Sequence, residues 1–256
     1  MENNRTYVYG VNSVLEKLKA APTDVLEVLI AKNAERPALR TITEAACRLD
    51  LRVTRVETAL LDQLVKGQRH QGVAARIEGF SYLSLTDLLQ NLSAAPGCQW
   101  VLILDGLTDP RNFGAVLRTA EAVGLQHVLI PKDRSVGITP TVVKASAGAA
   151  HHLKIYQVTN LRRAIAALKK QGFWIVGLHA EAQESLYDRD YPERLGIVLG
   201  NEGKGVRPLI QQECDFLAGI PMPGKIASLN VAVAGAVFLY ELLRRRLLID
   251  NDRGNR

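Results

Sequence analysis

The chain of 256 residues contains only three cysteines, Cys47, Cys98 and Cys214, and they are widely separated. An odd, scattered set of this size forms neither a disulfide framework nor a metal knuckle. No stretch approaches the roughly 18 uninterrupted apolar residues of a membrane span. The first residues, Met-Glu-Asn-Asn-Arg, also lack the apolar segment of a signal peptide. These absences predict a cytoplasmic protein with reduced thiols, no membrane segment and no metal site.

The sequence also lacks two common nucleotide-binding signatures. It contains no Walker-type phosphate loop, and the first expected strand of the C-terminal half, residues 101–104, is not followed by the glycine-rich turn of a dinucleotide site. This pattern disfavours an ATPase or an NAD enzyme. What the chain has is a basic balance, with 32 Lys and Arg against 26 Asp and Glu and a formal net charge of +6. Nucleic acid is therefore a candidate partner, although charge alone fits a basic protein without one equally well.

The N-terminal half alternates short strand-like and helix-like runs. Strands are expected at residues 7–9, 27–31, 51–56 and 72–77, and helices at 12–18, 37–49 and 59–65. This alternation predicts a small α/β domain over residues 5–78. Residues 79–98 interrupt the rhythm and are interpreted as an interdomain connection that partly packs, with a short helix at 85–92 that Ser84 caps.

The C-terminal half alternates on a larger scale. Strands are expected at 101–104, 127–130, 154–158, 173–177, 195–199 and 216–220, with helices between them and a last helix at 228–246. This order predicts a mostly parallel, doubly wound α/β domain over residues 99–247, followed by a flexible tail at 248–256. The last helix is apolar on nearly every face, which predicts either an interior helix or a subunit interface.

Three segments of this half share one local form, in which an apolar run leads into a break rich in Gly, Pro or Asn. The segments cover residues 105–118, 199–206 and 220–230, and their candidate site residues are Asn112, Arg118, Gly200, Glu202, Ile220, Ser228, Leu229 and Asn230. Breaks of this kind at strand ends are where open α/β sheets build ligand sites. The three segments therefore predict one catalytic centre.

The same segments resemble the three motifs of the SpoU (TrmH) family of RNA ribose 2'-O-methyltransferases, within the SPOUT superfamily. Residues 109–120 (Asp-Pro-Arg-Asn-Phe-Gly-Ala-Val-Leu-Arg-Thr-Ala) are similar to the first motif, residues 200–205 (Gly-Asn-Glu-Gly-Lys-Gly) to the second and residues 220–230 to the third. Their order and spacing match, and the resemblance covers about residues 5–246. It implies S-adenosyl-L-methionine as the cofactor, a SPOUT domain with a trefoil knot, and a homodimer. The general rarity of threaded chains would not predict the knot.

The resemblance also implies roles for the candidate residues. The cofactor is expected against the backbone of Gly200, Ile220 and Leu229, with Asn230 adjacent, and the catalytic set is Asn112, Arg118, Glu202, Ser228 and Asn230. Arg118 is the residue expected closest to the ribose hydroxyl. Because a guanidinium is a weak base, it is better suited to stabilising a developing alkoxide or holding a phosphate. Purely structural roles stay open, since Asn112, Ser228 and Asn230 also fit helix N-caps, and Ile220 and Leu229 fit a core.

Residues 5–78 resemble the substrate-binding domain of the ribosomal RNA branch of this family, an L30e-like RNA-binding module. The sequence His70-Gln71-Gly72 is its most recognisable piece. A phosphate-binding surface is expected from its arginines, which are Arg36, Arg40, Arg48, Arg52, Arg55, Arg69 and Arg76. The resemblance implies methylation of a guanosine ribose in 23S ribosomal RNA. A transfer RNA enzyme, a resistance-type rRNA enzyme and a non-catalytic RNA-binding or ribosome-assembly factor remain as alternatives.

Overall fold

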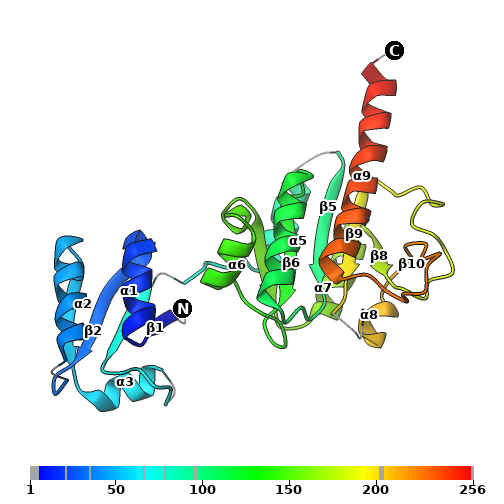
Figure 1. The fold of residues 1–256 in the computed structure, drawn as a ribbon. Coiled ribbons are helices and arrows are strands. Elements are labelled where there is room, and N and C mark those ends of the chain that lie inside the picture. Colours follow the sequence, from blue (N-terminus) through cyan, green and yellow to red (C-terminus); the bar gives the residue numbers. More distant parts are fainter. Residues whose placement is uncertain are drawn as a thin grey trace. The chain divides into compact units, whose positions relative to one another are not determined.

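The computed structural model describes residues 6–20, 22–34, 36–65, 67–77, 79–94, 97–201 and 205–254 (Figure 1). The chain divides into two compact units, Met1–Ser81 and Tyr82–Arg256. The strands and helices expected from the sequence pattern are present in both units, with ends that differ by a few residues. Among the described residues, no helix combines the length and hydropathy that a membrane span requires.

The first unit is a mixed four-stranded sheet in the order β1-β4-β2-β3. Strands β1 and β2 run antiparallel to β4, whereas β2 and β3 are parallel. Helices α1 and α2 cover one face of the sheet and α3 packs on the other, because their buried apolar residues recur at helical spacing. Its elements are β1 (Thr6–Tyr9), α1 (Val11–Ala20), β2 (Val25–Ala31), α2 (Pro37–Arg48), β3 (Arg52–Val56), α3 (Thr58–Leu64) and β4 (Val73–Ile77).

The second unit is built on a six-stranded sheet in the order β10-β8-β9-β5-β6-β7, in which every neighbouring pair is parallel. The predicted α/β class and parallel arrangement are confirmed. Its elements are α4 (Leu85–Ala94), β5 (Gln99–Leu104), α5 (Pro110–Ala122), β6 (His127–Pro131), α6 (Pro140–Ala145), β7 (Lys154–Val158), α7 (Leu161–Lys170), β8 (Trp174–Leu178), β9 (Arg194–Leu199), α8 (Pro208–Gln211), β10 (Phe216–Ala218) and α9 (Val231–Gly254).

Helices cover both faces of this sheet, which explains why its inner strands are almost continuously apolar. Leu88 and Leu92 of α4 pack with α7 and α8 in one core cluster. Helix α5 lies beside α6 and α9 over the other face (Figure 1). Within residues 79–98, helix α4 thus packs into the core of the second unit. Helical spacing predicted α4 but could not tell which unit its apolar side faces.

The structure selects among the expected helix caps, because Asn230 caps α9 whereas Asn112 and Ser228 do not hold the N-cap positions of α5 and α9. Asp109, not Asn112, caps α5, and its side chain accepts hydrogen bonds from the backbone N–H groups of Arg111 and Asn112. Helix α9 begins at Val231, not Ser228, because Asn230 accepts from the N–H of Ala232 at 2.9 Å. The same helix continues to Gly254, so the expected tail at 248–256 begins inside it.

The parallel sheet places the carboxyl ends of its strands along one edge. Residues following β8, β9, β10, β5 and β6 therefore meet there, and they include all three candidate segments. Helix α9 starts at this edge and passes close to β9, since a Cβ at Gly235 would lie 2.7 Å from a methyl carbon of Leu199. The fold thus gathers segments that are far apart in the sequence.

Candidate functional site

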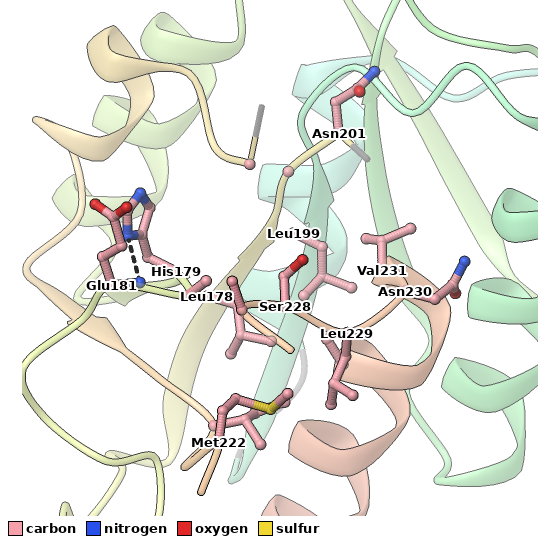
Figure 2. A pocket seen from close by; sticks show the side chains of 16 residues that line it. Leu178, His179, Glu181, Leu199, Asn201, Met222, Ser228, Leu229, Asn230 and Val231 are labelled. Atoms are coloured by element: carbon pink, nitrogen blue, oxygen red, sulfur yellow. Dashed lines mark hydrogen bonds between the residues drawn. The ribbon is translucent and has the colours of Figure 1, made fainter. Parts of the chain in front are cut away.

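A pocket of about 350 Å³ opens at the carboxyl ends of β8 and β9, next to the start of α9 (Figure 2). Its size is typical of small-molecule sites. The expected cofactor residues Gly200, Ile220, Leu229 and Asn230 all line it, together with Ser228. Sequence reasoning thus selected residues that the fold does bring to one cavity.

The described ends of the second segment, Asn201 and Gly205, meet at one side of this pocket. Asn201 and Gly205 exchange backbone hydrogen bonds of 3.0 and 2.9 Å, and a Cβ at Gly200 would lie 2.0 Å from the carbonyl carbon of Gly205. Only glycine fits such an approach of one backbone to another. The amide nitrogen Nδ2 of Asn201 donates to the carbonyl oxygen of Gly106 at 2.7 Å, which ties the second segment to the first. Glu202 lies outside the described residues.

An ion pair between a buried carboxylate and a partly exposed arginine holds the base of the same segment. Asp105, which is fully buried after β5, accepts hydrogen bonds from the backbone N–H of Arg207 at 2.9 Å and from its Nε at 2.7 Å. A buried carboxylate must be paired in this way. Sequence reasoning did not assign Asp105 a role, although an aspartate directly after a buried apolar strand was the available signal.

One hydrogen bond joins the first segment to the third. The Nδ2 of Asn230 donates to Oδ1 of Asn112 at 3.0 Å, while Oδ1 of Asn230 caps α9. Asn230 therefore both caps α9 and connects the pocket to the first segment. Asn112 lies in the first turn of α5 and does not line the pocket itself, so it reaches the pocket through Asn230.

Arg118 and Ser228 differ in where they lie. Ser228 is exposed in the loop before α9 and lines the pocket (Figure 2). Arg118 is exposed on α5, almost two turns beyond Asn112, and is not among the lining residues of the pocket in its own chain. The structure therefore brings together all described candidates except Arg118.

Sequence reasoning missed the wall of the pocket formed by residues after β8. His179 and Glu181 give it polar groups, and Leu178, the last residue of β8, gives it apolar surface, to which Met222 of the third segment adds (Figure 2). The backbone N–H of Glu181 donates to Nδ1 of His179 at 3.2 Å, so the neutral ring carries its proton on Nε2. The signal was positional, because His179 directly follows a strand that ends at the same sheet edge. Among the described residues, no group of three or more His, Cys, Asp or Glu is placed to hold a metal ion.

Comparison with known proteins shows which family the chain resembles. Residues 99–240 match the SpoU rRNA Methylase family, and residues 7–83 match the RNA 2'-O ribose methyltransferase substrate-binding family.

The chain belongs to the SpoU methylase family.

Relatives of similar length support this membership. The chain is 44% identical over 249 residues to the 23S rRNA (guanosine-2'-O-)-methyltransferase RlmB of Xylella fastidiosa, covering 97% of this chain and all of that one. It is 40% identical over 239 residues to RlmB of Pseudomonas aeruginosa, covering 93% and 96% of the two chains. The fold also matches the crystal structure of the SpoU methyltransferase AviRb from Streptomyces viridochromogenes in complex with AdoMet. That match has a TM-score of 0.62 and 20% identity, over 95% of this chain and 91% of that chain.

Proposed function

We propose that this SpoU-family chain transfers a methyl group from S-adenosyl-L-methionine to the ribose 2'-hydroxyl of a guanosine in 23S rRNA. The observation that carries this proposal is the pocket at the sheet edge, where the second and third segments line one cavity and Asn230 links it to Asn112 of the first. Relatives named RlmB that match over nearly their whole length support the RNA substrate and the guanosine.

The residues of the pocket fit the proposed cofactor. Its walls combine apolar side chains, such as Leu178, Leu199 and Met222, with polar groups such as His179 and Ser228 (Figure 2). Apolar surface suits the adenine ring, and backbone groups of Gly200, Ile220 and Leu229 are expected to bind the polar parts. The close approach of Gly200 to Gly205 gives a wall that a larger residue would disrupt. When bound, the cofactor supplies an electrophilic methyl group on a sulfonium.

The remaining chemistry belongs to side chains of the protein. The ribose oxygen forms the new bond to the methyl carbon as the carbon–sulfur bond breaks, and the hydroxyl proton leaves to a base or to water. Proper alignment of the two reactants is the larger part of such catalysis. We assign Arg118 to the developing charge on the ribose oxygen or to the adjacent phosphate, and Asn112, Glu202, Ser228 and Asn230 to positioning around it.

We propose a homodimer formed through α9, as the family resemblance implies. Val233, Tyr240 and Leu247 recur every seventh residue and are 49%, 53% and 53% exposed, so they form one apolar stripe along the helix. A stripe of this kind on a soluble protein favours an interface. The position of Arg118 outside the pocket lining of its own chain fits an arginine that serves the pocket of a second copy. The trefoil knot stays a prediction from the resemblance.

We assign the N-terminal unit to RNA binding, with an L30e-like fold and a cytoplasmic location as further predictions. The match of residues 7–83 to a substrate-binding family supports this role. Of the expected arginines, Arg36, Arg40 and Arg48 lie exposed at α2, Arg52 and Arg55 are exposed on β3, and Arg69 is exposed in the loop before β4. Arg76 is half-buried and forms an ion pair with Glu27 at 3.2 Å, which makes it a weaker candidate for a phosphate contact. The carboxylate contacts of Arg48 with Glu44 and of Arg52 with Glu27 are longer, at 3.9 and 4.0 Å.

The test is methyl transfer from labelled cofactor to unmodified 23S rRNA, with the methylated ribose mapped by primer extension. Incorporation at a single guanosine is the expected result. Incorporation only into transfer RNA would favour the transfer RNA alternative. Failure to bind the cofactor in calorimetry would favour a non-catalytic RNA-binding factor.

A further inference from the structure

A short turn after β6 places two exposed cations at the same sheet edge as the pocket. This basic turn consists of Lys132, Asp133, Arg134 and Ser135, of which the first three are exposed. It follows β6, the neighbour of β5 in the sheet, and β5 leads into the first segment of the site. Along the edge, the order is therefore the pocket at β8 and β9, the first segment after β5, and then the basic turn.

Hydrogen bonds to three other parts of the chain fix the backbone in and just after the turn. The N–H of Lys132 donates to the carbonyl oxygen of Val158 at 2.8 Å. The N–H of Val136 and the hydroxyl of Ser135 both donate to the carbonyl oxygen of Leu107, at 2.8 and 3.1 Å. Two residues further on, the N–H of Ile138 donates to the hydroxyl of Tyr82 at 2.6 Å. The turn is thus fixed against the first segment while its charged side chains face solvent.

Arg134 has a backbone conformation that an arginine rarely adopts. Its φ is 59°, in the left-handed region that favours glycine. Its carbonyl oxygen packs against Gly106, where a Cβ would come within 3.4 Å. Neighbouring groups must maintain such a conformation, and a glycine there would be less strained. Arg134 therefore presents an exposed guanidinium from a backbone that its surroundings hold in one conformation.

We propose that the basic turn binds the phosphate backbone of the RNA next to the target ribose, with Lys132 and Arg134 as the phosphate ligands. This inference rests on the proposed methylation of RNA and adds a contact surface that the three motifs do not include. Lysine and arginine on a rigid backbone are typical groups for positioning a nucleic acid without reading its sequence. Asp133 lowers the net charge of the turn to +1, whereas exposed Arg111 in the first turn of α5 adds a further cation beside the first segment.

The test compares Lys132→Ala, Arg134→Ala and Arg134→Gly in the full-length protein. The glycine variant removes the side chain while favouring the native backbone, so its effect cannot come from a distorted turn. The matched control is Lys170→Ala, which removes one exposed charge at the end of α7. This helix ends where β8 begins, so Lys170 lies at the amino ends of the strands, away from the pocket. The probe is unmodified 23S rRNA, and its dissociation constant is measured by filter binding over a series of salt concentrations.

Each of the three turn variants should bind the rRNA about three- to tenfold more weakly near physiological salt, and its slope of log affinity against log salt should become shallower by roughly one. Affinity for S-adenosyl-L-methionine should stay at the wild-type value, and Lys170→Ala should behave like wild type. An Arg134→Gly protein with unchanged RNA affinity and salt slope overturns the proposal, as does an equal loss in Lys170→Ala. Absence of methyl transfer by the wild type would instead count against the proposed function, because RNA binding is measured separately.

Discussion

Asn230 performs two tasks that one substitution can separate. Its Oδ1 caps α9, and its Nδ2 donates to Asn112. In Asn230→Asp the carboxylate still caps the helix, but the donor toward Asn112 is replaced by an acceptor. In Asn230→Ala both functions are lost. Comparing the two variants therefore measures the contribution of the link between the first and third segments apart from the stability of the helix.

The expected magnitudes differ in stability and in activity. Loss of an N-cap costs about 1 kcal/mol of unfolding free energy, and loss of an exposed hydrogen bond adds about 0.5 kcal/mol or more. Asn230→Ala should therefore be about 1.5 kcal/mol less stable. Asn230→Asp should stay within about 1 kcal/mol of wild type, since a negative charge at a helix N-terminus is favourable. Both should lose about 10- to 100-fold in kcat/KM, because a misplaced site group has costs of this order.

The assay combines urea unfolding with initial rates of methyl transfer to 23S rRNA. Asn112→Ala should reproduce the loss of activity, and the double variant Asn112→Ala, Asn230→Asp should lose little more than either single variant, since one bond is removed in each case. The matched control is Asn160→Ala. Asn160 caps α7 by accepting from the N–H of Arg163 at 3.0 Å, so its loss should reduce stability by about 1 kcal/mol and leave kcat/KM unchanged.

The result that would refute this reasoning is an Asn230→Asp protein with wild-type kcat/KM and wild-type stability. Asn230 would then be a helix cap alone. Strictly additive effects of Asn112→Ala and Asn230→Asp would also contradict the proposed link between the two side chains.

Three further outcomes are expected. Arg118→Ala should abolish methyl transfer while circular dichroism and cofactor calorimetry stay at wild-type values, and activity within a few-fold of wild type would exclude Arg118 from catalysis. Tyr240→Asp should convert the dimer to a monomer at micromolar concentration in light scattering, whereas an active wild-type monomer would exclude the proposed interface. Burial, with a smaller effect of Lys154, lowers the pKa of His127 to about 4, so unfolding in acid takes up a proton there. Stability should fall from about pH 6.5 to pH 4, by up to roughly 1.4 kcal/mol per pH unit from this residue, and His127→Gln should lose that part of the slope in urea titrations.

The sequence by itself determined the elements and their order. Period-two and helical spacing of apolar residues are local properties, and so is the predicted cap at Ser84, whose hydroxyl accepts from the N–H of Asp87 at 3.2 Å. The alternation of strands and helices led to a parallel sheet, because parallel strands need such crossovers. The three motifs also led to the correct family, since their order is written in the chain.

Only the tertiary structure decided which residues meet. Asn112 and Asn230 are 118 positions apart, and Asp105 and Arg207 are 102 apart. No local pattern marks such partners, because the fold of the whole sheet sets their distance. The cap of α5 is a local feature by contrast, because Asp109 accepts from the N–H groups of Arg111 and Asn112, and it takes the role expected of Asn112. The packing partners of α4 and the place of His179 in the pocket depend instead on distant parts of the chain, because α4 shares its core cluster with α7 and α8 and the loops after β9 and β10 complete the pocket around His179.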